Sequence, residues 1–237
     1  MKPNTFINYA HRGASEYLPE NTMLSFYTGI YMGANGIETD VQKTKDSIPV
    51  LFHDDSLLRV TGVSGAVSDY TFDELQKFNV TKNGFCDKIV SFEDFLQHFS
   101  FWDITFAIEL KAAGVEQDTA DLLRKYAMAE KTVVTSFDLA HIRKFREIAP
   151  EFQVGLLTSV VNDEIISQLQ QLHVQELCPK AALLTAGLVR QWHESGFRIR
   201  AWGVKTEELM RHAYDCGVDG MTVNFPDRLT RLLSAQR

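Results

Sequence analysis

Short apolar runs and longer amphipathic stretches alternate along this chain. The short runs are about four to six residues long, and most are rich in Val, Ile, Leu or aromatic residues, as buried β-strands are. They lie at Phe6–Ala10, Gly36–Val41, Phe106–Leu110, Thr132–Ser136, Gln153–Leu157, Gln175–Cys178, Arg198–Gly203 and Gly220–Val223. The pattern therefore predicts eight strands.

The stretches between the runs repeat apolar residues at the spacing of one helix face. The first has a candidate cap at Asn21 or Thr22 and ends near Gly33. The others span 116–129, 138–148, 162–172, 184–195 and 206–216. Strands that alternate with helices predict an α/β fold with a parallel sheet closed into a (β/α)8 TIM barrel, and an open doubly wound sheet is the alternative.

One long stretch, between Val41 and Phe106, breaks this rhythm. It holds an extended run at Pro49–His53, a loop rich in Gly, Ser and Thr, and two short helical patterns. We predict a small insertion after strand 2, at approximately residues 54–104, on the catalytic face of the barrel. No linker or shift in composition marks a boundary, so residues 1–237 are predicted to form a single domain.

Composition narrows the classes of partner. The 24 Lys and Arg residues against 31 Asp and Glu residues leave a net charge of −7, and basic residues do not cluster, which argues against a nucleic-acid partner. Three cysteines without paired spacing are typical of reduced thiols, and no apolar run is long enough to span a membrane. A His-Arg-Gly motif at residues 11–13 leaves no space for a secretion signal, so we expect a cytoplasmic protein.

Chemistry in such a barrel is expected at the carboxyl ends of the strands. Several polar or aromatic residues lie there: His11 and Arg12 after the first strand, Glu38 and Asp40 on the second, His53 at the end of the extended run, Glu109 and Lys111 at the third, and Trp202 near the end of the seventh. The other five histidines lie in or beside helical patterns, where packing or solvent exposure explains them.

Three carboxylates are expected to converge. Side chains alternate along a strand, so Glu38 and Asp40 point the same way, and Glu109 lies on the neighbouring strand. Their mutual repulsion would be relieved by one divalent cation, and all-oxygen ligation favours Mg²⁺ or Ca²⁺ over zinc. Arg12 and Lys111 would then supply positive charge for an anionic substrate.

These residues fall within a longer series of motifs. The series comprises Ala10-His11-Arg12-Gly13, Pro19-Glu20-Asn21-Thr22, Ile37-Glu38-Thr39-Asp40-Val41, His53-Asp54, Leu58-Arg59-Val60-Thr61, Glu109-Leu110-Lys111, Trp202 and Asn224-Phe225-Pro226-Asp227. In this order the set resembles the glycerophosphodiester phosphodiesterase family, in its short cytoplasmic bacterial form, over essentially the whole chain.

The resemblance implies a barrel of the phosphatidylinositol-phospholipase-C-like type. It also implies metal-dependent hydrolysis of a small glycerophosphodiester to sn-glycerol 3-phosphate and an alcohol. The roles it implies are metal ligation by Glu38, Asp40 and Glu109, acid–base catalysis by His11 and His53, and substrate or phosphate contact by Arg12, Lys111 and Trp202. We expect His11 to act as the base and His53 as the acid, because an imidazole pKa suits both tasks near neutral pH.

The sequence leaves several alternatives open. The nucleophile is either the glycerol 2-hydroxyl, which would give a cyclic phosphate, or water. A lysophospholipase-D-like enzyme or a cyclising phospholipid lyase would use the same residues, and a non-catalytic barrel that binds phospholipid head groups is a further alternative. The alcohol of the substrate, the choice between Mg²⁺ and Ca²⁺, and the oligomeric state, including a homodimer, also stay open.

Overall fold

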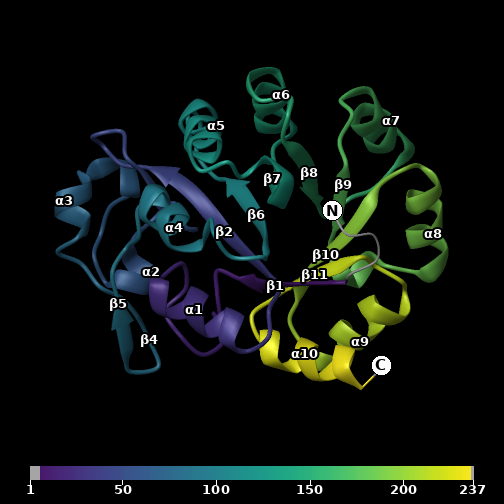
Figure 1. The fold of residues 1–237 in the computed structure, drawn as a ribbon, viewed down its shortest axis with the longest axis horizontal. Coiled ribbons are helices and arrows are strands. Elements are labelled where there is room, and N and C mark those ends of the chain that lie inside the picture. Colours follow the sequence, from purple (N-terminus) through teal and green to yellow (C-terminus); the bar gives the residue numbers. More distant parts are fainter. Residues whose placement is uncertain (1–5, 236–237) are drawn as a thin grey trace.

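A closed barrel of eight parallel strands forms the centre of the computed structural model, which describes residues 6–235 (Figure 1). The strands are β1 (Ile7–His11), β2 (Gly36–Lys43), β6 (Thr105–Leu110), β7 (Thr132–Ser136), β8 (Gln153–Thr158), β9 (Glu176–Pro179), β10 (Arg198–Val204) and β11 (Gly220–Val223). Because β1 pairs with both β2 and β11, the sheet has no open edge at this point. The predicted TIM barrel is confirmed, and the open sheet is excluded.

Helices surround the barrel, as Figure 1 shows. They are α1 (Met23–Tyr31), α4 (Phe92–Phe99), α5 (Glu116–Lys125), α6 (Leu139–Ile148), α7 (Asp163–Gln171), α8 (Ala186–Glu194), α9 (Glu207–Asp215) and α10 (Pro226–Ser234), with single 3₁₀ turns at Ala129–Lys131 and Ala181–Leu183. The pattern of apolar residues did not predict α10. Its signal was Pro226, which stands in the first turn, where a helix needs no backbone N–H donor.

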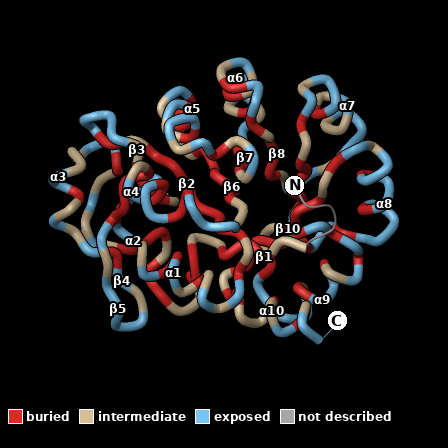
Figure 2. Tube along the Cα trace, in the orientation of Figure 1, coloured by how far each residue is buried: buried red, intermediate tan, exposed pale blue. Residues whose placement is uncertain are grey.

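The main apolar core lies between the barrel and its helices rather than inside the barrel. Along β2, Ile37 and Val41 face outward into this core, whereas Glu38 and Asp40 point inward. In Figure 2 the strands are largely buried, while the helices are exposed on their outer sides. The inward positions of the barrel are therefore free to carry polar side chains.

The segment between β2 and β6 contains two parts that pack differently. Its outer part, on the left of Figure 1, consists of β3 (Pro49–Leu51), α2 (Leu58–Thr61), a 3₁₀ turn (Val67–Asp69), α3 (Phe72–Leu75), β4 (Val80–Lys82) and β5 (Phe85–Asp87). This part has its own small core, which includes Val50, Phe52 and Leu57. The helix α4 instead packs Phe95 and Phe99 into the main core, as the helix of the second strand–helix unit.

Strand β3 holds this outer part beside the barrel. It pairs antiparallel with β2, with Val41 opposite Leu51, and so carries the chain back from the carboxyl end of β2 until His53 lies near Asp40. No helix in residues 6–235 is both long enough and apolar enough to cross a bilayer.

Candidate active site

The turn after β1 has an unusual backbone. Arg12 and Gly13 have φ angles of 54° and 84°, in the left-handed region. A Cβ atom on Gly13 would lie 2.4 Å from Ser25, so only glycine fits there. The chain can therefore turn sharply against α1, and both His11 and Arg12 line a cavity at the carboxyl end of the barrel.

The three predicted carboxylates lie together in this part of the structure. Asp40 pairs in register with Glu109 on the adjacent strand, and Glu38 precedes Asp40 by two residues on the same face. One carboxylate oxygen from each lies within 4.8 Å of the others, and all three residues are buried. This cluster offers the oxygen donors that Mg²⁺ and Ca²⁺ prefer.

The charges of the cluster are only partly balanced. Burial, together with the neighbouring carboxylates, raises the pKa of Glu109 to about 7 and that of Glu38 well above its ordinary value. Burial alone would also raise the pKa of Asp40, but the Arg12 guanidinium lowers it. Asn21 donates to one oxygen of Asp40 at 2.9 Å, while the other oxygen is buried and accepts no hydrogen bond from the described residues. A divalent cation fits this donor set.

The two predicted histidines have different partners. The Nδ1 atom of His11 lies 2.5 Å from the amide oxygen of Asn224, and its Nε2 atom lies 3.8 Å from Glu38. Burial and the Arg12 charge lower the pKa of His11 to about 3. In contrast, the Nδ1 atom of His53 lies 2.6 Å from the carboxylate of Asp54. One imidazole is therefore oriented by a neutral amide and the other by an anion.

The two predicted phosphate-contacting cations are already paired with carboxylates. Arg12 contacts Asp40 through Nε at 3.2 Å and donates to Glu20 through Nη1 at 2.9 Å. Lys111 donates to Glu109 at 3.0 Å. Their charge is therefore shared with the acidic cluster and with Glu20.

These groups converge on a cavity of about 230 Å³. Among the predicted site residues its walls include His11, Arg12, Glu38, His53, Glu109 and Trp202. The ring of Trp202 meets that of Phe137 edge-on at 4.9 Å, and its Nε1 donates to the carbonyl of Thr158. The cavity lining thus includes both charged and aromatic side chains.

The sequence over residues 11–228 matches the family model of the glycerophosphoryl diester phosphodiesterase family. This chain belongs to that family. Relatives named glycerophosphodiester phosphodiesterase include one from Bacillus altitudinis, 30% identical over 94% of this chain and 96% of that protein. Another, from Caldanaerobacter subterraneus subsp. tengcongensis, is also 30% identical over 94% of this chain and 96% of that protein.

A solved phosphodiesterase structure from Oleispira antarctica, in complex with the product sn-glycerol-3-phosphate, has the same fold. It superposes with a TM-score of 0.87 at 22% identity and covers 95% of this chain and 96% of that chain. The family membership and the shared barrel identify this protein as an enzyme of the glycerophosphoryl diester phosphodiesterase family.

Glu20, Asp54 and Asn224 contact predicted site residues, and Arg59 contacts Glu20 and Asp54. The sequence alone had assigned none of these four a role. All four stand within the motifs that carry the family resemblance, so their positions were visible in the sequence. Their contacts were not, because they join segments up to 213 residues apart.

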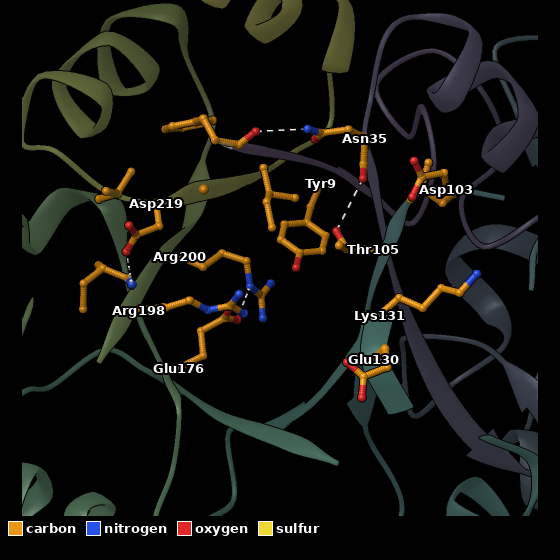
Figure 3. A pocket seen from close by; sticks show the side chains of 16 residues that line it. Tyr9, Asn35, Asp103, Thr105, Glu130, Lys131, Glu176, Arg198, Arg200 and Asp219 are labelled. Carbon is orange, nitrogen blue, oxygen red and sulfur yellow. Dashed lines mark hydrogen bonds and ion pairs between the residues drawn. The ribbon is translucent and has the colours of Figure 1, made fainter. Parts of the chain in front are cut away.

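A larger cavity, of about 930 Å³, lies at the opposite end of the barrel (Figure 3). Its lining includes residues that precede or begin strands, such as Asn35, Thr105 and Gly220. Figure 3 shows Glu176, Arg198 and Arg200 pointing toward one another inside it. No histidine lines this cavity in the described part of the chain, and the three-carboxylate cluster lies elsewhere, so the smaller cavity is the better candidate for the active site.

Proposed function

We propose that this phosphodiesterase hydrolyses glycerophosphodiesters to sn-glycerol 3-phosphate and an alcohol. The observation that carries the proposal is one cavity lined by two histidines and by two of the three clustered carboxylates. The names of the relatives and the product bound in the Oleispira antarctica structure support the same reaction.

In this proposal Glu38, Asp40 and Glu109 hold one divalent cation, either Mg²⁺ or Ca²⁺. When bound, the ion supplies positive charge that polarises the phosphoryl oxygens. Arg12 and Lys111 lie next to these carboxylates and supply further positive charge for the phosphodiester anion. Trp202 also lines the cavity and would contact the glycerol or the alcohol.

The partners of the two histidines support a division of labour. Because the amide oxygen of Asn224 accepts the Nδ1 proton of His11, the Nε2 lone pair of His11 is free to take a proton from the nucleophile. The Asp54 carboxylate accepts from Nδ1 of His53 and orients the imidazole, so that Nε2 of His53 can donate a proton to the leaving alcohol oxygen. A phosphorus–oxygen bond forms to the nucleophile while the bond to the leaving alcohol breaks.

Product analysis separates the two routes and the rival activities. If the glycerol 2-hydroxyl attacks, a cyclic phosphate forms first and water opens it, with the histidine roles reversed. Direct attack by water gives glycerol 3-phosphate without this intermediate. Cyclic phosphate that accumulates without glycerol 3-phosphate would instead identify a lyase, and binding without turnover in Mg²⁺ or Ca²⁺ would identify a head-group-binding protein.

The central test is the release of glycerol 3-phosphate from a panel of glycerophosphodiesters, with each metal and with EDTA. We expect activity only with the metal, and a loss of about 10²–10⁴-fold in His11→Ala and His53→Ala. His98 is an exposed histidine on α4 whose side chain contacts the Asp94 carbonyl and the rings of Tyr27 and Phe99, and it supplies the control His98→Ala. Near wild-type activity in either catalytic variant would remove that histidine from the mechanism.

We also propose that the enzyme acts in the cytoplasm as a single domain, with reduced thiols. Cys86, Cys178 and Cys216 form no disulfide in the structure. Fractionation of cells, with thiol titration of the purified protein, tests this proposal.

A further inference from the structure

A single arginine side chain joins two carboxylates beside the active site. Arg59, on α2, donates from Nε and Nη2 to the two oxygens of Asp54, at 2.5 and 3.0 Å. It also donates from Nη1 and Nη2 to the two oxygens of Glu20, at 2.9 and 2.6 Å. All three guanidinium nitrogens are used, in the planar geometry that lysine cannot reproduce.

Each of these carboxylates in turn holds a functional side chain. Asp54 accepts from Nδ1 of His53, and Glu20 accepts from Nη1 of Arg12. The contacts form one chain of alternating partners: His53, Asp54, Arg59, Glu20, Arg12 and Asp40. Arg59 lies between the two halves of this chain. One half, Asp54 and His53, orients the proposed acid, and the other half, Glu20 and Arg12, orients the proposed phosphate-binding arginine.

The two halves come from different parts of the fold. Asp54 and Arg59 belong to the outer segment after β3, whereas Glu20 follows the turn after β1. The Glu20 side chain is 13% exposed and that of Asp54 is 24% exposed, so both carboxylates are largely shielded from water. Mainly through its hydrogen bond from Arg59, the pKa of Asp54 falls to about 2, which keeps this carboxylate ionised as an acceptor for His53.

We propose that Arg59 is a positioning residue that holds His53 through Asp54 and Arg12 through Glu20. The inference rests on the proposed function, since it concerns the groups that protonate the leaving alcohol and bind the phosphate. It also assigns the outer segment a purpose: α2 carries the residue that holds the acid in place over the barrel.

The test uses two substrates that differ in their need for an acid. Glycerophosphoglycerol has an alkyl leaving group that must be protonated, whereas the p-nitrophenyl ester of glycerol 3-phosphate has a leaving group that departs as the anion. Single-turnover rates of alcohol release, with enzyme in excess, isolate this bond cleavage from later steps. The quantity of interest is the ratio of the two rates in each variant.

In Arg59→Ala we expect release from glycerophosphoglycerol to slow by about 10²-fold and release from the p-nitrophenyl ester by less than about tenfold. The smaller loss, common to both substrates, reflects the loosened Arg12, and in steady-state assays it should appear as a raised KM for both substrates. Asp54→Asn should slow alcohol release from glycerophosphoglycerol more than release from the p-nitrophenyl ester. Glu20→Gln should cause the smaller slowing that is common to both substrates. Arg59→Lys, which keeps the charge without the planar donors, should behave like Arg59→Ala.

Arg124 provides a matched control, because it also contacts two carboxylates, those of Glu151 and Asp121, but on the surface of α5. Arg124→Ala should leave both rates unchanged. Far-UV circular dichroism checks folding, and if Arg59→Ala unfolds, Arg59→Lys and Asp54→Asn carry the test.

Two failures are distinguishable. Wild-type enzyme that releases neither alcohol would overturn the proposed function. Wild-type activity on both substrates, with equal slowing of both in Arg59→Lys and Asp54→Asn, would overturn the positioning role.

Discussion

Both ends of the barrel interior bury charged side chains, but the two sets of charges are balanced differently. Toward the amino end, Glu176 contacts Arg200 at 2.7 Å and Arg198 at 3.1 Å, and Arg200 extends far enough along the interior to line the smaller cavity as well. Arg200 uses its other two nitrogens on Thr222 and Cys178. At the carboxyl end, three carboxylates face one another, and one oxygen of Asp40 has no hydrogen-bond donor among the described residues.

The difference separates a structural role from a functional one. A buried ion pair offsets its desolvation only when its geometry is good and its remaining donors are satisfied, as those of Arg200 are. Carboxylates that repel one another cost stability unless a cation joins them. The charges at the amino end are therefore balanced within the protein, whereas the carboxyl end offers oxygen donors that fit a divalent cation.

The largest expected effect is on catalysis at the carboxyl end. Glu109→Gln removes one candidate ligand and should lower the rate of glycerol 3-phosphate release by about 10³-fold or more, because a bound metal contributes several kcal/mol to the transition state. The melting temperature in EDTA should not fall, since a repelling charge is removed. A melting temperature several degrees lower in EDTA would show that Glu109 is structural and would weaken the comparison.

The opposite pattern is expected at the amino end. Glu176→Gln leaves the buried Arg200 without its carboxylate, and the free energy of unfolding should fall by about 3–5 kcal/mol in a denaturant titration. Activity per folded molecule should persist. Glu151→Gln, which breaks an exposed pair with Arg124, serves as the control and should cost about 1 kcal/mol or less. Equal losses of unfolding free energy in Glu176→Gln and Glu151→Gln would contradict the structural role assigned to the buried ion pair.

The smallest effect is the response of stability to metal and pH. The pKa of Glu109 is about 7 in the folded chain and about 4.3 in an unfolded one. Between these values the folded state keeps a proton that the unfolded state has lost, so metal-free stability falls as pH rises.

A cation at a hundred times its Kd should contribute about 2.7 kcal/mol, or about 5–10 °C in Tm. This gain should be larger at pH 8 than at pH 5 because protons compete with the metal at low pH, and it should shrink in Glu109→Gln. Differential scanning fluorimetry with Mg²⁺, Ca²⁺ or EDTA measures it. An equal gain at both pH values would argue against binding at these carboxylates.

Local patterns were sufficient to predict the barrel and much of the candidate site. Eight apolar runs separated by helical patterns predicted the strands, because a buried strand consists of consecutive apolar residues. The period of two along β2 was enough to place Glu38 and Asp40 on one face. The same logic failed for α10, whose start is marked by Pro226 rather than by a preceding cap residue.

What the sequence by itself determined is the set of strands, their order and the inward alternation of the acidic residues, all of which follow from short-range periodicity. Only the tertiary structure decided that α4 packs with the barrel, that Asn224 faces His11, and that Arg59 joins Asp54 to Glu20. The reason is physical. These contacts depend on closing the sheet between β1 and β11 and on folding the outer segment back over β2, and neither event leaves a periodic signal in neighbouring residues.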